Sequence, residues 1–77
     1  MHIEELIAII EQEFNEMPKG VLKPESSYKD IIGLTSINAL ILIAVIDNTY
    51  DVILTADDIK KSNTLQELFD CIKNSKN

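Results

Sequence analysis

The sequence predicts an all-α fold, a small bundle of four helices made of three main helices plus one short helix. Three segments carry apolar residues at spacings of three and four, which is the period of a helix that buries one face. Turn residues and helix-capping residues separate these segments. The chain has 77 residues, enough for a single domain, which we expect to span residues 1–77.

The first predicted helix runs from about residue 2 to residue 17. Its apolar residues recur every three or four positions, and its glutamates fall on the other faces. Pro18 is expected to stop the helix, because proline cannot continue the backbone hydrogen bonding. The face predicted to be buried consists of Ile3, Leu6, Ile7, Ile10, Phe14 and Met17.

Residues 18 to 35 are predicted to form a long loop, because Pro, Gly and Ser recur along them. A loop of about 17 residues with no structure of its own is uncommon in a compact domain, and such loops often have a function. Several apolar side chains are expected to pin this loop across the helices: Val21, Leu22, Tyr28, Ile31, Ile32 and Leu34.

The second main helix is predicted over residues 36 to 50, which contain no Gly or Pro. Either Thr35 or Ser36 is expected to cap it by accepting a hydrogen bond from a free backbone N–H. Because β-branched residues are common here, a buried strand is the competing interpretation, but the length favours a helix. The predicted buried face is Ala39, Leu42, Ile43, Ile46 and Tyr50, with Leu42, Ile43 and Ile46 at its centre.

Two further helices complete the prediction, over residues 55 to 61 and residues 64 to 73. Thr55 is expected to cap the first of them, and either Asn63 or Thr64 the second. Buried apolar side chains are expected before and within these helices at Val52, Leu54, Leu65, Leu68, Phe69 and Ile72.

The charge balance excludes several kinds of partner. Seven Lys and no Arg stand against 13 Asp and Glu, which gives a net charge of −6. Such a chain repels nucleic acid and anionic lipid, because neutralising phosphates needs an excess of basic side chains. The longest apolar run, residues 39 to 46, is far shorter than the roughly 20 residues of a membrane-spanning helix. We therefore expect no nucleic acid, no membrane insertion and basic protein partners.

The cysteine usage and the first residues predict the cellular compartment. Cys71 is the only cysteine, so it has no partner for an internal disulfide, which fits a reducing compartment. Residues 1 to 5 lack the positively charged leader of a secretory signal. We expect a cytoplasmic protein.

Few residues offer catalytic or metal chemistry. His2 is the only histidine and lies at one end of the sequence, so no Ser–His or Cys–His pair is predicted. One Cys and one His lack the clustered spacing of a zinc site. Asp57 and Asp58 suit the first turn of a helix, where acids stabilise the helix dipole, better than a cation site. We therefore expect no metal site and no catalysis by this chain.

One short stretch, Gly33-Leu34-Thr35-Ser36-Ile37, carries a more specific signal. It places a serine hydroxyl where a long loop meets a helix N-terminus. On one interpretation Ser36 is simply a helix cap. On the other, Ser36 carries a covalent phosphate-linked group, which would face the free N–H groups and the positive end of the helix dipole.

The sequence resembles the acyl carrier proteins along almost its whole length. That family attaches its cofactor to a serine in a Leu-Asp-Ser-Leu motif, which opens the second helix after a long loop. The matching stretch here is Leu34-Thr35-Ser36-Ile37. Residues 50–54, 57–59 and 63–68 are similar to the family's turn, short third helix and start of the last helix.

The resemblance implies that Ser36 bears 4′-phosphopantetheine, whose terminal thiol holds an acyl group as a thioester. It also implies a carrier that catalyses nothing itself. A phosphopantetheinyl transferase would modify it, and acyl-loading and acyl-processing enzymes would use it as a substrate. The pathway implied is fatty-acid, polyketide, or specialised lipid or amino-acyl biosynthesis.

Two departures from the family pattern bear on this function. The residue before the serine is usually Asp, which is thought to help the transferase dock, and here it is Thr35. The exposed face of the second helix is usually acidic, but here it is almost uncharged, and Asn38 and Ile41 stand where acids are common. The residues opposite the predicted core face are Ile37, Leu40, Ile41 and Ala44.

Three explanations stay open for this apolar face: docking of a partner enzyme, partial burial within the bundle, and self-association. Docking is the explanation we favour, because exposed apolar patches mark interaction sites. The departures also leave an alternative function, an unmodified carrier-like domain that acts as a structural or regulatory interaction module. The residues expected to meet partner enzymes are Ile37, Leu40, Ile41, Asp47 and Asp51.

Overall fold

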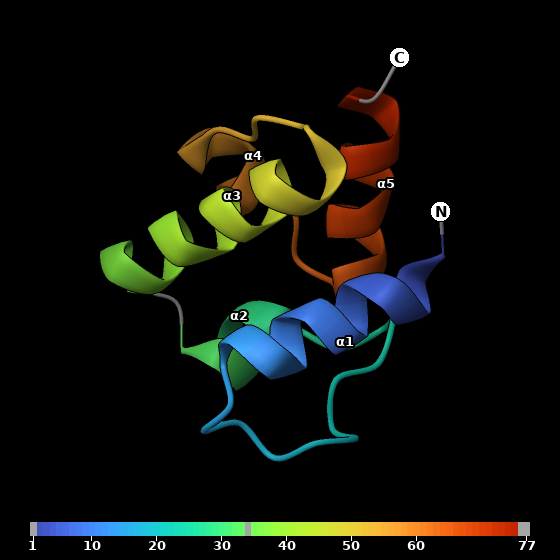
Figure 1. The fold of residues 1–77 in the computed structure, drawn as a ribbon, viewed down its shortest axis with the longest axis vertical. Coiled ribbons are helices and arrows are strands. Elements are labelled where there is room, and N and C mark those ends of the chain that lie inside the picture. Colours follow the sequence, from blue (N-terminus) through green and yellow to red (C-terminus); the bar gives the residue numbers. More distant parts are fainter. Residues whose placement is uncertain (1, 34, 76–77) are drawn as a thin grey trace.

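The structure is a computed structural model that describes residues 2–33 and 35–75 (Figure 1). Within these residues the chain forms only helices as regular elements, which confirms the predicted all-α bundle. None of these helices has the length and apolar character needed to cross a membrane. In chain order they are α1 (Ile3–Glu13), α2 (Tyr28–Ile32), α3 (Ser36–Tyr50), α4 (Ala56–Lys61) and α5 (Leu65–Ser75).

The first helix, α1, ends at Glu13 and not at residue 17 as predicted. Phe14 leaves the helical conformation, and the Met17 N–H donates to the Phe14 carbonyl at 3.0 Å in the turn that follows. This turn brings Met17 into the core. Pro18 disfavours a helical backbone at the residue before it, so the last predicted turn of this helix is wrong.

A helix that the sequence did not predict, α2, lies inside the segment predicted as a loop (Figure 1). Gly33 ends it with φ 75°, a left-handed conformation that glycine adopts without a side-chain clash. The prediction of a loop over residues 18–35 is therefore wrong for residues 28–32. A helix of five residues is too short to show a helical period. Leu34, which was expected to help pin this segment, lies outside the described residues.

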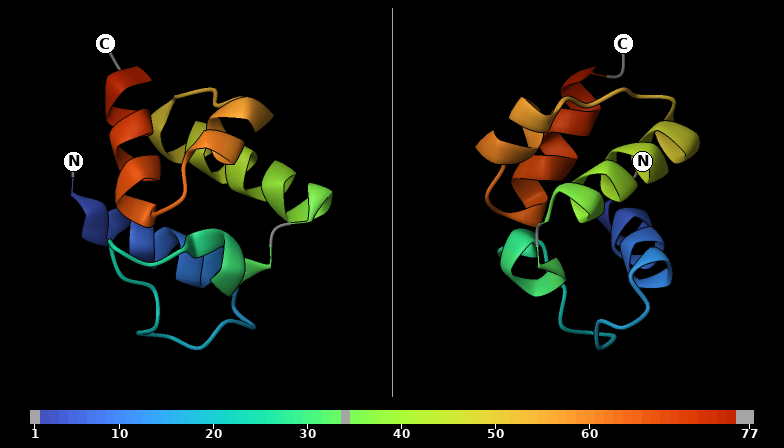
Figure 2. Two further views of the ribbon diagram at one scale, coloured as in Figure 1. Left: turned by 180° about the vertical axis from the view of Figure 1, so that it is seen from behind. Right: turned by 90° about the vertical axis from the view of Figure 1, so that its left-hand side faces the viewer.

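The start of α5 holds the segment that leads into α2. The backbone N–H groups of Leu65 and Gln66 donate to the carbonyls of Ser26 and Pro24 at 3.0 and 2.8 Å. A helix leaves its first N–H groups without partners inside the helix, so these bonds satisfy groups on both segments. In Figure 2 the connection between α1 and α2 loops out at one end of the molecule. The end of α2 lies close to the start of α3 in the same views.

Thr64 is the residue that caps α5. Its Oγ1 accepts a hydrogen bond from the Glu67 N–H at 3.1 Å. The Glu67 carboxylate in turn accepts bonds from the N–H groups of Thr64 and Asn63, at 2.9 and 2.8 Å, which lowers its pKa. This reciprocal pair is a capping box, and it settles the choice between Asn63 and Thr64 that the sequence left open.

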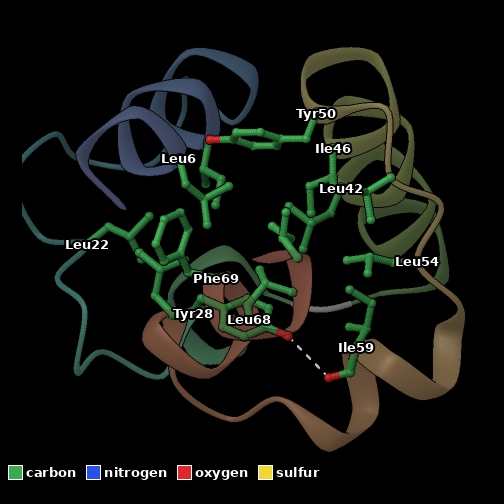
Figure 3. Packing of buried hydrophobic residues seen from close by; sticks show 14 of the residues in the cluster. Leu6, Leu22, Tyr28, Leu42, Ile46, Tyr50, Leu54, Ile59, Leu68 and Phe69 are labelled. Carbon is green, nitrogen blue, oxygen red and sulfur yellow. Dashed lines mark hydrogen bonds between the residues drawn. The ribbon is translucent and has the colours of Figure 1, made fainter. Parts of the chain in front are cut away.

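The core lies where α1, α3 and α5 face one another (Figure 3). Tyr28 of α2 also enters the core, and its hydroxyl donates to the Ile59 carbonyl of α4 at 3.1 Å. Burial raises the pKa of Tyr28 to about 12. The predicted plugs Val52 and Leu54 are buried as expected. Side chains with no exposed surface include Leu6, Ile10, Leu42, Ile46, Leu65, Leu68 and Ile72.

The predicted core face of α3 is confirmed with two exceptions, Ala39 and Ile43, which are both only half-buried. Leu42 and Ile46 are fully buried, and Tyr50 nearly so. Ile43 is only half-buried, because it points toward α4 and lines a cleft there. The prediction of Ile43 as a core residue is therefore wrong in degree: it lies at the edge of the core.

This difference predicts unequal costs for two similar truncations. Leu42→Ala should lower the free energy of unfolding by about 2–5 kcal/mol, because it leaves a cavity in a closed core. Ile43→Ala should cost clearly less, because solvent already reaches its side chain. Urea unfolding midpoints of the two variants would measure both costs, and equal losses would contradict the placement of Ile43 beside a cleft.

Candidate functional site

Thr35, and not Ser36, caps α3. The Thr35 Oγ1 accepts a hydrogen bond from the Asn38 N–H at 3.1 Å, and the Thr35 carbonyl accepts the first bond of the helix, from Ala39, at 2.9 Å. Ser36 is therefore the first residue inside the helix, and its side chain is exposed. The Ser36 hydroxyl forms no hydrogen bond with any described residue, so capping does not occupy it.

The surroundings of Ser36 favour a negatively charged group. Among the described residues, no acceptor binds the backbone N–H groups of Ser36 and Ile37, as is expected at the start of a helix. The first turn of α3 contains no acidic side chain. The aligned peptide dipoles of a 15-residue helix place partial positive charge at this end. A phosphodiester on Ser36 would thus meet unpaired donors and a favourable field.

A cleft of about 360 Å³ opens beside Ser36, between α3 and α4. We call it the α3–α4 cleft. Its walls are mainly apolar, with the Lys60 side chain as the one charged group among the described lining residues. An aliphatic chain attached through Ser36 would find apolar surface directly next to its attachment point. The lining residues are Thr35, Ser36, Ala39, Leu40 and Ile43 from α3, and Ala56, Ile59 and Lys60 from α4.

Ile41 lies on the opposite side of α3, where a second cleft of about 400 Å³ opens. We call it the α1–α2 cleft, because α2 and the end of α1 form its other walls. Ile41 is half-buried there, whereas Ile37 and Leu40 are strongly exposed. For Ile41, partial burial within the bundle is the explanation that holds. The residues lining this cleft include Phe14, Met17, Ile31, Ile32, Asn38 and Ile41.

The other predicted partner residues are on the surface. Ile37 and Leu40 keep 69% and 66% of their side-chain area exposed, which is unusual for large apolar residues. Asp47 and Asp51 are also exposed. Asp51 has a structural task as well, since it ends α3 in the left-handed conformation, with φ 58°, that Asp tolerates better than most residues.

Sequence reasoning missed Ile53, which is the most exposed large apolar residue described, at 78%. It stands between the buried Val52 and Leu54. Alternate residues of an extended segment point in opposite directions, so two buried neighbours predict an outward Ile53. That alternation was visible in the sequence and could have found it.

The remaining candidates for chemistry have structural partners. The Asp57 carboxylate pairs with Lys61 at 3.0 Å, and the Asp58 carboxylate accepts a bond from the Thr55 N–H at 2.9 Å. Cys71 is half-buried, and burial raises the pKa of its thiol. Within residues 2–33 and 35–75, no three or more His, Cys, Asp or Glu side chains are grouped so that they could hold a metal ion.

Comparison with known proteins agrees with this geometry. Residues 4–72 match a family model described as the phosphopantetheine attachment site. Acyl carrier proteins from Chlorobium phaeobacteroides, Chlorobium phaeovibrioides and Chlorobium luteolum are each 35% identical over 54 residues, which cover 70% of this chain and 69% of theirs. The fold and the site define a class of small helical proteins with an exposed serine at a helix start. The chain belongs to the acyl carrier protein family, and its cofactor is 4′-phosphopantetheine.

The cap at Thr35 generates a testable prediction about α3. Thr35→Ala removes the acceptor for the Asn38 N–H and should lower the free energy of unfolding by about 1 kcal/mol. Thr35→Asp keeps an acceptor of equal or better quality and should unfold at the wild-type temperature or above it. Thermal unfolding followed by circular dichroism would measure both variants. A Thr35→Ala protein as stable as wild type would show that Thr35 is not the cap.

Proposed function

We propose that this chain carries acyl intermediates as thioesters on a 4′-phosphopantetheine arm attached to Ser36. The single observation that supports this assignment is the free state of the Ser36 hydroxyl. Thr35 performs the capping task, and the serine next to it stays exposed with no hydrogen bond to a described residue. A serine needed only for capping would have its oxygen on a backbone N–H.

The chain acts in this proposal as a substrate and not as a catalyst. The Ser36 oxygen would form a bond to the phosphorus that carries the pantetheine in coenzyme A. The bond from that phosphorus to the second phosphate would break, 3′,5′-ADP would leave, and the hydroxyl would lose its proton to the transferase or to water. The N–H groups of Ser36 and Ile37, which bind no acceptor among the described residues, would be available to the new phosphodiester.

The α3–α4 cleft supports an aliphatic acyl cargo. Its walls next to Ser36 come from side chains such as Ala39, Ile43 and Ile59, which offer contact to a hydrocarbon but few polar partners. An acyl chain on the arm could therefore bury part of its apolar surface in this cleft. Fatty-acid, polyketide and specialised lipid or amino-acyl biosynthesis all supply acyl groups of this general kind.

The surface around Ser36 supports partners that dock through apolar contact. Ile37 and Leu40 are strongly exposed and flank the attachment serine, while Asp47 and Asp51 offer charged contacts farther along α3. The proposed partners are a phosphopantetheinyl transferase and the acyl-loading and acyl-processing enzymes that would use the arm. Because Ile41 is half-buried, we assign it a smaller part in docking than its two apolar neighbours.

The attachment is tested by intact mass spectrometry. The chain is incubated with coenzyme A, Mg²⁺ and a broad-specificity phosphopantetheinyl transferase, and Ser36→Ala is treated in parallel. The wild-type chain should gain the mass of one phosphopantetheine, and Ser36→Ala should gain nothing. Ser26→Ala is a matched control at a serine outside the helix start, and it should be modified like wild type.

Absence of modification would favour a different function. If a folded wild-type sample gains no mass, even with a transferase from its own host, the chain is better described as an unmodified interaction module. The observation that favours this alternative is Thr35, which stands in place of the family's Asp before the serine. A mass gain retained by Ser36→Ala would instead keep the carrier function and move the attachment to another serine.

Apolar docking is tested with Ile37→Ser. This change removes apolar surface at an exposed position and should leave the free energy of unfolding within about 0.5 kcal/mol of wild type. The KM of the transferase for the unmodified chain should rise roughly tenfold, as expected when an anchor residue of an interface is truncated. Val21→Ser is the matched control, because Val21 is also exposed but belongs to the loop before α2. An unchanged KM for Ile37→Ser would contradict docking on this face.

A further inference from the structure

Asn38 joins the end of α2 to the start of α3. Its side-chain Nδ2 donates to the Gly33 carbonyl at 2.8 Å and to the Ile32 carbonyl at 3.4 Å. Its backbone N–H donates to the capping oxygen of Thr35. Asn38 is half-buried and is the third residue of α3, two positions after Ser36. One side chain thus connects both ends of the turn that carries the serine.

The bonds that Asn38 donates require an amide. The last carbonyls of a helix have no partner inside the helix, and those of α2 receive donors from the Asn38 side chain. The Gly33 carbonyl also accepts the Thr35 N–H at 3.0 Å. An ionised carboxylate has no proton to donate to a carbonyl, and its charge would repel these oxygens. Aspartate is nearly the same size as asparagine, so it tests the donors without a change of shape.

The helix α2, which accepts the Asn38 bonds at its end, is also hydrogen-bonded to α4. The Tyr28 hydroxyl donates to the Ile59 carbonyl at 3.1 Å, and the Lys29 Nζ donates to the Lys60 carbonyl at 2.8 Å. Both acceptors lie in α4, and Ile59 and Lys60 also line the α3–α4 cleft. A continuous set of hydrogen bonds therefore runs from α3 through Asn38 and α2 to α4. It links the wall of the cleft that carries Ser36 to the opposite wall.

We propose that Asn38 is a positioning residue for the modification of Ser36. Its amide fixes the first turn of α3 against α2, and so fixes the backbone position of Ser36 relative to α4. This inference rests on the proposed function, because a position matters only if an enzyme uses the serine. Holding a reacting group in its productive geometry is worth large rate factors, and small misplacements lower the rate of the chemical step.

The experiment measures kcat and KM of a phosphopantetheinyl transferase for the full chain and three variants. Asn38→Ala removes the donors, and Asn38→Asp removes them and adds a charge. Asn48→Asp is the matched control, because it places the same charge on the exposed far end of the same helix. Both Asn38 variants should lower kcat about tenfold with KM close to wild type, and Asn48→Asp should leave kcat unchanged.

If Asn38 served only the stability of α3, Asn38→Asp would not lower kcat. An acid in the first turn of a helix interacts favourably with the helix dipole, so Asn38→Asp would then stabilise α3 and leave kcat intact. That result, or an increase in KM alone, overturns the positioning role while the proposed function stands. A wild-type chain that is not modified at all overturns both.

A measurement on the wild-type chain removes any dependence on how the variants fold. The Thr35 N–H and the Asn38 side-chain amide both donate to the Gly33 carbonyl, so their hydrogens should exchange with solvent more slowly than those of exposed amides. Nuclear magnetic resonance of the unmodified chain measures this exchange. Exchange as fast as at the exposed Asn48 side chain would overturn the proposal.

Discussion

The capping bond from the Asn38 N–H to the Thr35 hydroxyl is the interaction on which the functional geometry depends. Two neighbouring hydroxyl side chains stand at the start of α3, and a helix start offers a cap to only one of them. Because Thr35 takes it, the Ser36 hydroxyl remains exposed inside the first turn. The same arrangement leaves the N–H groups of Ser36 and Ile37 without an acceptor among the described residues, so a bonded phosphate would meet donors at its attachment point. Thr35 thus leaves the neighbouring serine available for the proposed attachment.

The third helix, α3, has more than one buried side, which explains its nearly uniform apolar sequence. Leu42 and Ile46 enter the core, Ile43 lines the α3–α4 cleft, and Ile41 lines the α1–α2 cleft. A helix that packs on several sides carries apolar residues all round. Among the large apolar residues of α3, this packing leaves only Ile37 and Leu40 strongly exposed. The apolar face discussed from the sequence therefore divides into a structural part and an exposed part beside Ser36.

Prediction from the sequence succeeded where a pattern extends over many residues. The apolar faces of α1, α3 and α5, and the cap at Thr55, follow from periodicity and side-chain chemistry. α2 was missed because five residues carry no measurable period, although Gly33 marks its end. The bonds from Asn38 to the end of α2 were also missed, because they form only after the chain has turned at Gly33. The position of Ser36 was predicted, but the sequence could not decide whether it or Thr35 caps the helix.

The central proposal is that the arm is attached to Ser36 and that its cargo reaches the α3–α4 cleft. Amide nuclear magnetic resonance tests this proposal most directly. Spectra would be compared for the unmodified chain, the phosphopantetheine-bearing chain and the same chain loaded with a medium-length acyl group. Modification should move the signals around Ser36, and loading should then move those of Ala39, Ile43 and Ile59. Loading that moves the signals of the α1–α2 cleft, and leaves the α3–α4 cleft unchanged, would contradict this assignment.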